Sequence, residues 1–100
     1  MTDLCNEINN FGKGIGSAAR YRIIEALLPG PKTVTELVKK VKQSQPAVSQ
    51  HLKALKSYNL VKDKREGKEV YYSVNAEYTL KLLTSLVNDI KNKPKPKKGK

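Results

Sequence analysis

Cysteine, histidine and acidic residues are scarce in this chain. Its 100 residues include one Cys, one His, no Trp and 9 Asp or Glu. A single cysteine cannot form an internal disulfide or a cysteine-rich zinc site. One cysteine and one histidine far apart in the sequence are also weak support for a catalytic nucleophile and its base. The composition therefore argues against an enzyme and against a disulfide-stabilised secreted domain, and it fits a reducing cytoplasm.

Long apolar runs are absent too, so no membrane-spanning helix is expected. The N-terminus, "MTDLCNEINN", carries acids and lacks the basic flank and apolar core of a secretory signal. The glycines of "GKGIGSAAR" are not a phosphate-binding loop, because no strand precedes them and no Gly-Lys-Ser/Thr ends them. We therefore expect no catalytic site, no cofactor and no membrane-spanning segment.

Positive charge is what the chain has in excess. It carries 20 Lys and Arg against 9 acids, for a net charge of +11. Such an excess favours a polyanionic partner, either nucleic acid or an anionic membrane surface. The length corresponds to one small domain. We assign residues 1–92 to that domain and the lysine-rich residues 93–100 to a disordered tail.

Apolar spacing and capping residues predict four helices before the chain reaches Tyr58. The first helix has one apolar face, and each of the next three follows a residue that can cap its N-terminus. The predicted features are the apolar series Leu4, Ile8, Phe11 and Ile15, the cap Ser17 before a helix at 18–28, the capping box of Thr33 and Glu36, and the cap Ser44. Glycines at 12, 14 and 16 are expected to weaken the end of the first helix.

After Tyr58 the apolar period changes from the helical value to two. The segment predicts a β-hairpin with strands at about 60–65 and 68–74 and a turn at Glu66-Gly67. Asn75 can cap a last helix at about 76–92, which is apolar over a wide arc. The predicted fold class is therefore mainly α with a small β-hairpin.

The stretch "SQPAVSQHLKALKSYNLV" is the part of the sequence most informative about function. A helical projection places Val48, Leu52 and Leu55 on one stripe, which predicts the buried side of the fourth helix. No acidic residue lies between Ser44 and Lys62. The side opposite the stripe carries Pro46, Ser49, Gln50, Lys53 and Ser57. Ser and Gln can donate and accept hydrogen bonds, as base edges require, so this side suits DNA reading. The alternative is a solvated surface that happens to lack acids.

The elements around this helix favour the DNA interpretation. A short helix, a tight turn and a second helix form a helix-turn-helix, whose second helix enters the major groove. The hairpin that follows carries basic residues near its tip, namely Lys62, Lys64, Arg65 and Lys68. A basic hairpin in this position is typical of the wing of a winged helix.

These segments resemble the ArsR/SmtB family of small dimeric winged-helix repressors. The resemblance rests on "SAARYRIIEALL", "TVTELVKKVKQSQPAVSQHLKAL" and "LVKDKREGKEVYYSV", and it covers roughly residues 4–90. It implies a winged helix-turn-helix of five helices and a two-stranded wing that binds double-stranded DNA. The DNA-binding residues inferred from the resemblance and the polar side together are Ser44, Gln45, Pro46, Ser49, Gln50, Lys53, Lys64, Arg65 and Lys68.

The resemblance also implies a homodimer, because the first and last helices build the dimer interface in this family. The wide apolar arc of the last helix matches that role. The residues assigned to the interface are Leu4, Ile8, Leu82, Leu83, Leu86, Val87 and Ile90. A dimer of this kind would act on a palindromic operator.

The chain departs from the family pattern at two places. Lys42 and Gln43 stand where the helix-turn-helix turn usually has a glycine and an apolar residue. Lys42 is therefore expected to adopt a positive φ, at a cost of about 1 kcal/mol. Arsenic-responsive members carry two cysteines where this chain has Thr33 and Thr35, and zinc-responsive members use His and carboxylates on the last helix, which here lacks His. We expect no metal site, and the inducer is left open.

Two functions are consistent with the sequence. The first is a sequence-specific repressor; the second is a less specific architectural DNA-binding protein, suggested by the lysine tail and the missing sensor site. A winged helix used only for protein contacts is a third, weaker option. The tail either adds affinity for any DNA through phosphate contacts or is merely solvated. His51 is expected to be packed or to touch phosphate.

Overall fold

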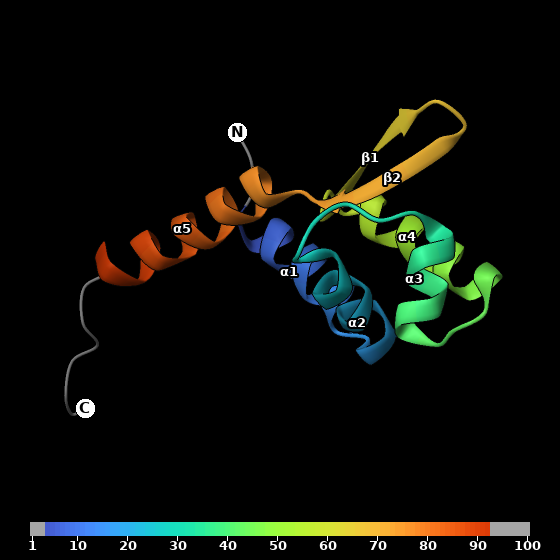
Figure 1. Cartoon of the computed structure of the whole chain (residues 1–100). Helices are drawn as coiled ribbons and strands as arrows, with labels where there is room; N and C mark the ends of the chain where they lie inside the picture. The colour runs from blue at the N-terminus through green and yellow to red at the C-terminus, as the bar shows by residue number, and fades with distance from the viewer. Residues whose placement is uncertain (1–3, 93–100) are drawn as a thin grey trace.

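The computed structural model describes residues 4–92, so the predicted tail at 93–100 lies outside the described residues. The elements are α1 (Leu4–Ile15), α2 (Ala18–Leu27), α3 (Val34–Val41), α4 (Gln45–Ser57), β1 (Val61–Glu66), β2 (Glu69–Val74) and α5 (Ala76–Asn92). Figure 1 shows the first four helices gathered in one body, with the hairpin projecting from one end and α5 from the other. This arrangement confirms the predicted winged helix-turn-helix.

Four of the helices begin at the capping residues that the sequence predicts. Ser17, Ser44 and Asn75 each accept a hydrogen bond from the backbone N–H three residues later. At the start of α3 the Glu36 N–H donates to Thr33 Oγ1 at 3.2 Å, and the Thr33 N–H donates to Glu36 Oε1 at 2.9 Å. These bonds satisfy N–H groups that have no partner within the helix.

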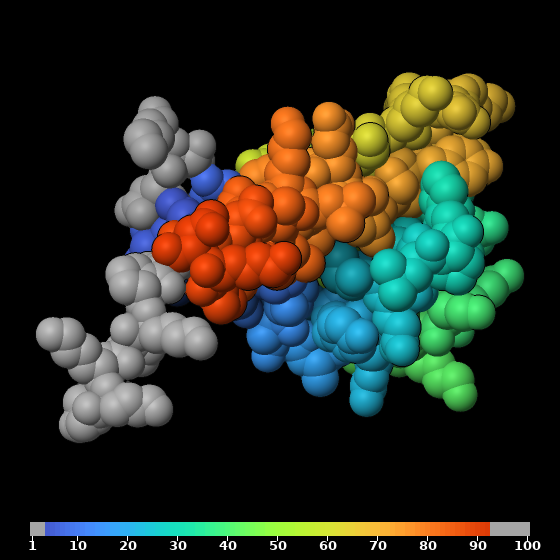
Figure 2. All heavy atoms as spheres, turned by 90° about the vertical axis from the view of Figure 1, so that its left-hand side faces the viewer, coloured from blue at the N-terminus to red at the C-terminus, as the bar shows by residue number. Residues whose placement is uncertain are grey.

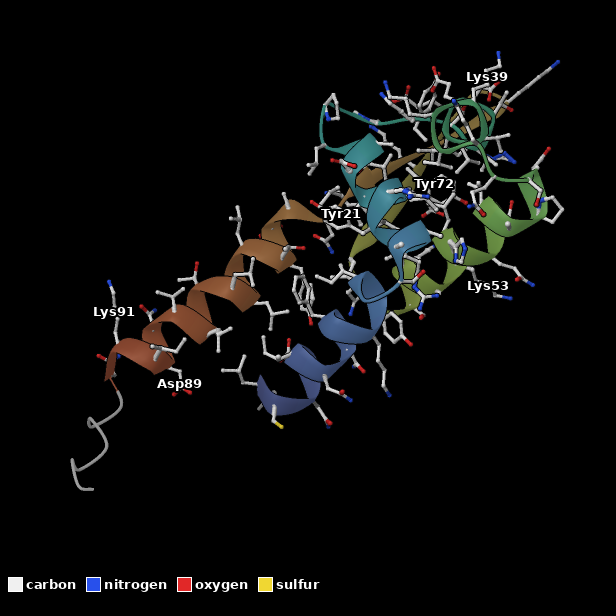
Figure 3. The ribbon with its side chains drawn as sticks, turned by 90° about the horizontal axis from the view of Figure 1, so that it is seen from below. Tyr21, Lys39, Lys53, Tyr72, Asp89 and Lys91 are labelled. Carbon is white, nitrogen blue, oxygen red and sulfur yellow. The ribbon has the colours of Figure 1, made fainter. Side chains whose placement is uncertain are left out.

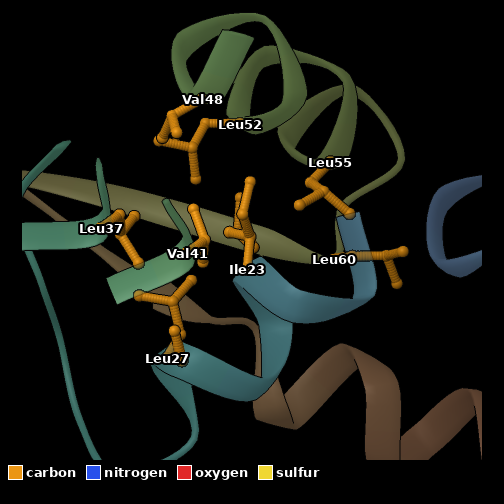
Figure 4. Packing of buried hydrophobic residues seen from close by; sticks show 10 residues of the cluster. Ile23, Leu27, Leu37, Val41, Val48, Leu52, Leu55 and Leu60 are labelled. Carbon is orange, nitrogen blue, oxygen red and sulfur yellow. The ribbon is translucent and has the colours of Figure 1, made fainter. Parts of the chain in front are cut away.

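One apolar core joins α2, α3, α4 and the base of the hairpin. Figure 4 shows its side chains meeting between these elements. The largest fully buried members are Ile23, Leu27, Leu37, Val48, Leu52, Leu55, Leu60 and Val61. Burial of one such side chain contributes roughly 1.5–3 kcal/mol, so the helix-turn-helix pair is held firmly from within.

The hairpin is one residue displaced from its predicted position. Val61 pairs with Val74 at the base, and Glu66 pairs with Glu69 beside the turn. The two turn residues are therefore Gly67 and Lys68, and not Glu66-Gly67 as predicted. Gly67 has a φ of +64°, which suits the first central position of a type II′ turn, where glycine is favoured.

A single β-bridge that the sequence did not reveal supports the base of the wing. The Lys32 N–H donates to Tyr72 O at 3.0 Å, and the Tyr72 N–H donates to Lys32 O at 2.8 Å. The Asn75 N–H closes the base by donating to Leu60 O at 2.9 Å. The lower half of the hairpin is thereby attached to the start of α3, while its upper half extends beyond the body (Figure 1).

The glycines of α1 do not end the helix early, because α1 continues to Ile15. Gly14 is buried, and a Cβ atom at this position would overlap Leu60 Cδ1. Arg20 completes the C-terminus of α1, with Nε donating to Gly14 O at 3.0 Å and Nη2 donating to Lys13 O at 3.2 Å. Glycine therefore permits the close approach of α1 to Leu60, which follows α4.

The first turns of α5 pack against α1, as Figure 2 shows from the side of these two helices. The Tyr78 hydroxyl donates to Glu7 Oε1 at 2.8 Å. Burial raises the pKa of Tyr78 above its usual value, and the bond to Glu7 adds to this effect. Tyr78 therefore remains a hydrogen-bond donor at neutral pH.

Among residues 4–92, two residues other than glycine adopt left-handed backbone conformations, one on each side of α4. Lys42 precedes the helix with φ 57° and ψ 44°, as the sequence predicts, and Asn59 follows it with φ 64°. After α4, the Leu60 N–H donates to Leu55 O and the Asn59 N–H donates to Lys56 O, which is the Schellman arrangement. Asn tolerates this conformation better than Lys.

We predict that Lys42→Gly stabilises the fold by about 1 kcal/mol, because glycine adopts the left-handed conformation without a Cβ clash. Chemical denaturation monitored by circular dichroism would measure the change in the free energy of unfolding. Lys42→Ala is the matched control, since it removes the same charge but keeps the Cβ atom. Equal stabilisation by both variants would attribute the gain to charge and contradict a conformational cost at Lys42.

Candidate nucleic-acid interface

The side of α4 predicted to read DNA is exposed in full. Its buried stripe is the predicted one: Val48, Leu52 and Leu55 are no more than 1 % exposed. Figure 3 shows Lys53 directed away from the body on the open side of the helix. The exposed residues, called here the α4 polar face, are Ser44, Gln45, Pro46, Ser49, Gln50 and Lys53. The core thus fixes which side of α4 is offered to a partner.

The hydrogen-bonding groups at the centre of this face are not used within the chain. Among residues 4–92, the side chains of Gln45, Ser49 and Gln50 make no intramolecular hydrogen bond. The hydroxyls at the two ends are used locally: Ser44 caps the helix, and Ser57 Oγ donates to Ala54 O at 2.6 Å. Donors and acceptors are therefore available where a base edge would lie.

The three predicted wing residues are exposed, but the structure separates them. Lys64 lies opposite Tyr71, and Arg65 lies opposite Val70. Because successive residues of a strand point to opposite faces, Lys64 and Arg65 project on different sides of the wing, and Lys68 lies in the turn. One duplex against one side of the hairpin would meet only one of Lys64 and Arg65 directly.

The wing is also less positive than its basic residues alone indicate. The segment 62–69 holds four basic and three acidic residues. Lys64 Nζ lies 3.7 Å from Glu66 Oε2, and Glu66 stands directly across from Glu69. The basic groups of the wing are therefore partly neutralised.

One pair of residues at this site was missed by the sequence analysis. Lys56 Nζ, in the last turn of α4, lies 2.9 Å from Asp63 Oδ2 in β1. The hydrogen bond from Lys56 to Asp63, with the negative charge of Asp63, raises the pKa of Lys56. No periodic pattern could have indicated this contact, because it joins a helix and a strand across a connection with its own turn geometry.

The predicted dimerisation surface divides into two parts. Leu82 is only 3 % exposed within one chain, so its assignment to an intersubunit surface is corrected: it packs inside the chain. Leu4, Ile8 and Leu86 are half-buried. The exposed apolar residues of α5, called here the α5 outer stripe, are Leu80, Leu83, Val87 and Ile90. This stripe includes Leu80, which was not among the predicted interface residues.

Two further findings describe the chain around the interface. Within residues 4–92, no helix combines the length and apolar composition that a membrane span requires. In the same part of the chain, no group of three His, Cys, Asp or Glu side chains is placed to hold a metal ion. His51 is half-buried on α4, beside the core stripe.

Comparison with known proteins assigns the chain to a family. A family model described as bacterial regulatory protein, ArsR family, matches residues 17–63, which contain α2, α3, α4 and the start of β1. The chain is 34% identical over 68 residues to the transcriptional repressor SdpR of Bacillus subtilis (strain 168), covering 68% of this chain and 76% of that protein. The chain belongs to the ArsR family.

Solved structures extend the similarity beyond the family match. NolR from Sinorhizobium fredii superposes with a TM-score of 0.69 at 31% identity, covering 84% of each chain. A homodimeric winged helix-turn-helix DNA-binding domain from Mycobacterium bovis, described as a possible ArsR-family regulator, gives a TM-score of 0.73 at 28% identity. That similarity covers 89% of this chain and 88% of the other. This ArsR-family protein is therefore a DNA-binding transcriptional regulator and not an enzyme.

We predict that Gln50→Ala weakens binding to the preferred DNA site by roughly 1–3 kcal/mol and binding to random DNA by less, because Gln50 lies at the centre of the α4 polar face. Of Lys64→Ala and Arg65→Ala, the variant at the residue that faces the duplex should instead weaken binding to all sequences alike, as loss of a phosphate contact does. Fluorescence anisotropy on both DNAs at fixed salt measures the difference. Equal losses on both DNAs for Gln50→Ala would place this residue among the phosphate contacts.

Proposed function

We propose that this ArsR-family protein is a homodimeric repressor that recognises a palindromic DNA operator through α4. The α4 polar face carries the proposal. It is acid-free from Gln45 to Ser57, exposed, and held in place by three buried side chains on the opposite side of the helix. Gln45, Ser49 and Gln50 are assigned to base edges, and Ser44 and Lys53 to the phosphates beside them.

The wing supplies contacts to the DNA backbone in this proposal. Lys68 lies in the exposed turn, while Lys64 and Arg65 lie on opposite sides of the strand. Such contacts add affinity and fix orientation without distinguishing sequences. Because the wing holds nearly as many acids as bases, sequence discrimination is assigned to α4 and not to the hairpin.

Dimerisation through α5 is supported by the α5 outer stripe. Val87 is 49% exposed, and Ile90 is 66% exposed although both are aliphatic. An apolar stripe of this kind at helical spacing favours burial against a partner. The similar domain from Mycobacterium bovis is homodimeric. A two-fold axis at α5 would place two α4 helices about 34–36 Å apart, one turn of DNA, which is the spacing that a palindrome requires.

The proposed repressor does not sense metals through either site known from its family. Thr33 stands at the first cysteine position, and its hydroxyl is engaged in the capping box of α3. Thr35 stands at the second. The acids of α5 are Glu77 and Asp89, with no His, and carboxylates alone are poor ligands for zinc or nickel.

A footprint on DNA separates this proposal from a less specific architectural DNA-binding protein, which the net charge of +11 would also suit. A DNA site should first be selected from a random library with the full chain. Protection of one bounded, symmetric region on that site supports the repressor. Uniform coverage of the whole fragment would contradict it.

We predict that Val87→Glu produces monomers and weakens binding to the palindrome by at least tenfold, because a charge on the α5 outer stripe opposes burial. Ser85→Glu adds the same charge to α5 outside the stripe and is the matched control. Sedimentation measures the oligomeric state, and anisotropy measures the affinity. A monomeric Val87→Glu protein that binds the palindrome with full affinity would disprove the role of the dimer.

We predict that stoichiometric zinc, nickel, cadmium or arsenite leaves the DNA affinity unchanged, because Thr33 and Thr35 cannot supply thiolates and α5 lacks His. A titration of the protein–DNA complex with each ion provides the measurement. Release of DNA by one tightly bound ion per subunit would contradict the prediction. Comparison with Cys5→Ser would then show whether the thiol is the ligand.

A further inference from the structure

The Lys56–Asp63 ion pair joins the recognition helix to the wing. Lys56 Nζ and Asp63 Oδ2 are 2.9 Å apart, and the two side chains are 54% and 30% exposed. Within the described residues 4–92, no other side-chain hydrogen bond or ion pair connects α4 with the hairpin. Two elements assigned to DNA contact are thus linked by one polar contact.

The pair lies at the level where the backbone support of the wing ends. Val61 is buried at the base, whereas the rest of β1 is exposed. Asp63 stands opposite Tyr72, the residue that bonds to Lys32. Beyond this level, three further residues of β1 lead to the turn, which at about 3.4 Å per residue is roughly 10 Å of hairpin. Within residues 4–92, Lys56–Asp63 is therefore the outermost hydrogen bond between β1 and the body.

The Lys56–Asp63 ion pair contributes little to the stability of the fold. An ion pair between exposed side chains contributes roughly 0–1 kcal/mol, because water screens it. The contact does restrict direction: α4 is fixed by the core, the Lys32–Tyr72 bridge holds β2 to the start of α3, and the tilt of the hairpin relative to α4 also depends on how β1 is held. Holding Asp63 against the last turn of α4 restrains that tilt.

Asp63 is at the same time unfavourable for DNA binding on simple electrostatic grounds. Lys56 follows Lys53 by three residues, so it lies at the edge of the α4 polar face. Asp63 neutralises this lysine and places a negative charge beside the surface offered to phosphates. Electrostatics alone therefore predicts that loss of Asp63 strengthens binding to every DNA.

We propose that the Lys56–Asp63 pair is a positioning contact that sets the angle of the wing relative to α4, so that both engage one duplex in a single register. The proposal rests on the proposed function, because it assumes that α4 reads bases and the wing contacts the backbone. Its consequence differs from that of simple electrostatics in the ratio of the two affinities, which electrostatics alone would leave unchanged. Without Asp63, binding to random DNA strengthens, while the preference for the selected site falls.

Asp63→Ala and Glu69→Ala form a matched pair for the test. Each removes one negative charge from the wing, but Glu69 lies beside the turn and makes no ion pair within residues 4–92. Affinities of the full chain are measured on the library-selected site and on random DNA at equal salt. For Asp63→Ala the ratio of the two affinities should fall roughly five- to tenfold. For Glu69→Ala both affinities should rise, and the ratio of the two affinities should stay unchanged.

Exchanging the two charged residues tests whether an ion pair at this position restores the preference for the selected site. Lys56→Asp combined with Asp63→Lys keeps the net charge and restores an ion pair of opposite polarity, so the ratio should recover toward the wild-type value. Identical behaviour of Asp63→Ala and Glu69→Ala, or a failed rescue with both proteins folded by circular dichroism, would overturn the positioning role. A wild-type chain with no preference for its selected site would instead overturn the proposed function itself.

Discussion

The burial of Val48, Leu52 and Leu55 is the constraint on which the rest of the structure depends. These side chains enter a core shared with α2 and α3, so they determine both the position of α4 and the side that it exposes. A rotation of α4 by one residue would bury Lys53 and Lys56 in one direction or His51 in the other, and burying such polar groups without hydrogen-bond partners is costly. The side of α4 that we propose to read DNA is thus set by packing on the opposite side of the helix.

The two ends of α4 are determined by backbone geometry more than by packing. Lys42 turns the chain from α3 into the cap at Ser44, and Asn59 turns it from α4 into the wing. Both turns use the left-handed region, which few side chains enter without cost. The angle between α3 and α4 and the direction of the hairpin therefore depend on single residues, while the core supplies the free energy that holds them there.

Much of this arrangement could be predicted from the sequence, because caps, helical stripes and alternating strands leave local signals. Thr33 with Glu36, Ser44, and the stripe headed by Val48 are examples. The bridge between Lys32 and Tyr72 could not be predicted, since one residue pair distant in sequence has no period. Leu82 was assigned outward because spacing alone cannot show that α1 already covers one side of α5. The roles of individual DNA-facing residues remain predictions.

The close contact at Gly14 connects α1 with the residues between α4 and the wing. Leu60 fills the space above Gly14, and Leu60 is also the residue whose N–H completes the end of α4. On its other side, α1 is bonded to α5 through Glu7 and Tyr78. A path of contacts thus runs from the last helix, through α1, to the residues that join α4 and β1. The last helix and the base of the wing are therefore connected through α1, and not only through the strand β2 that lies between them in the sequence.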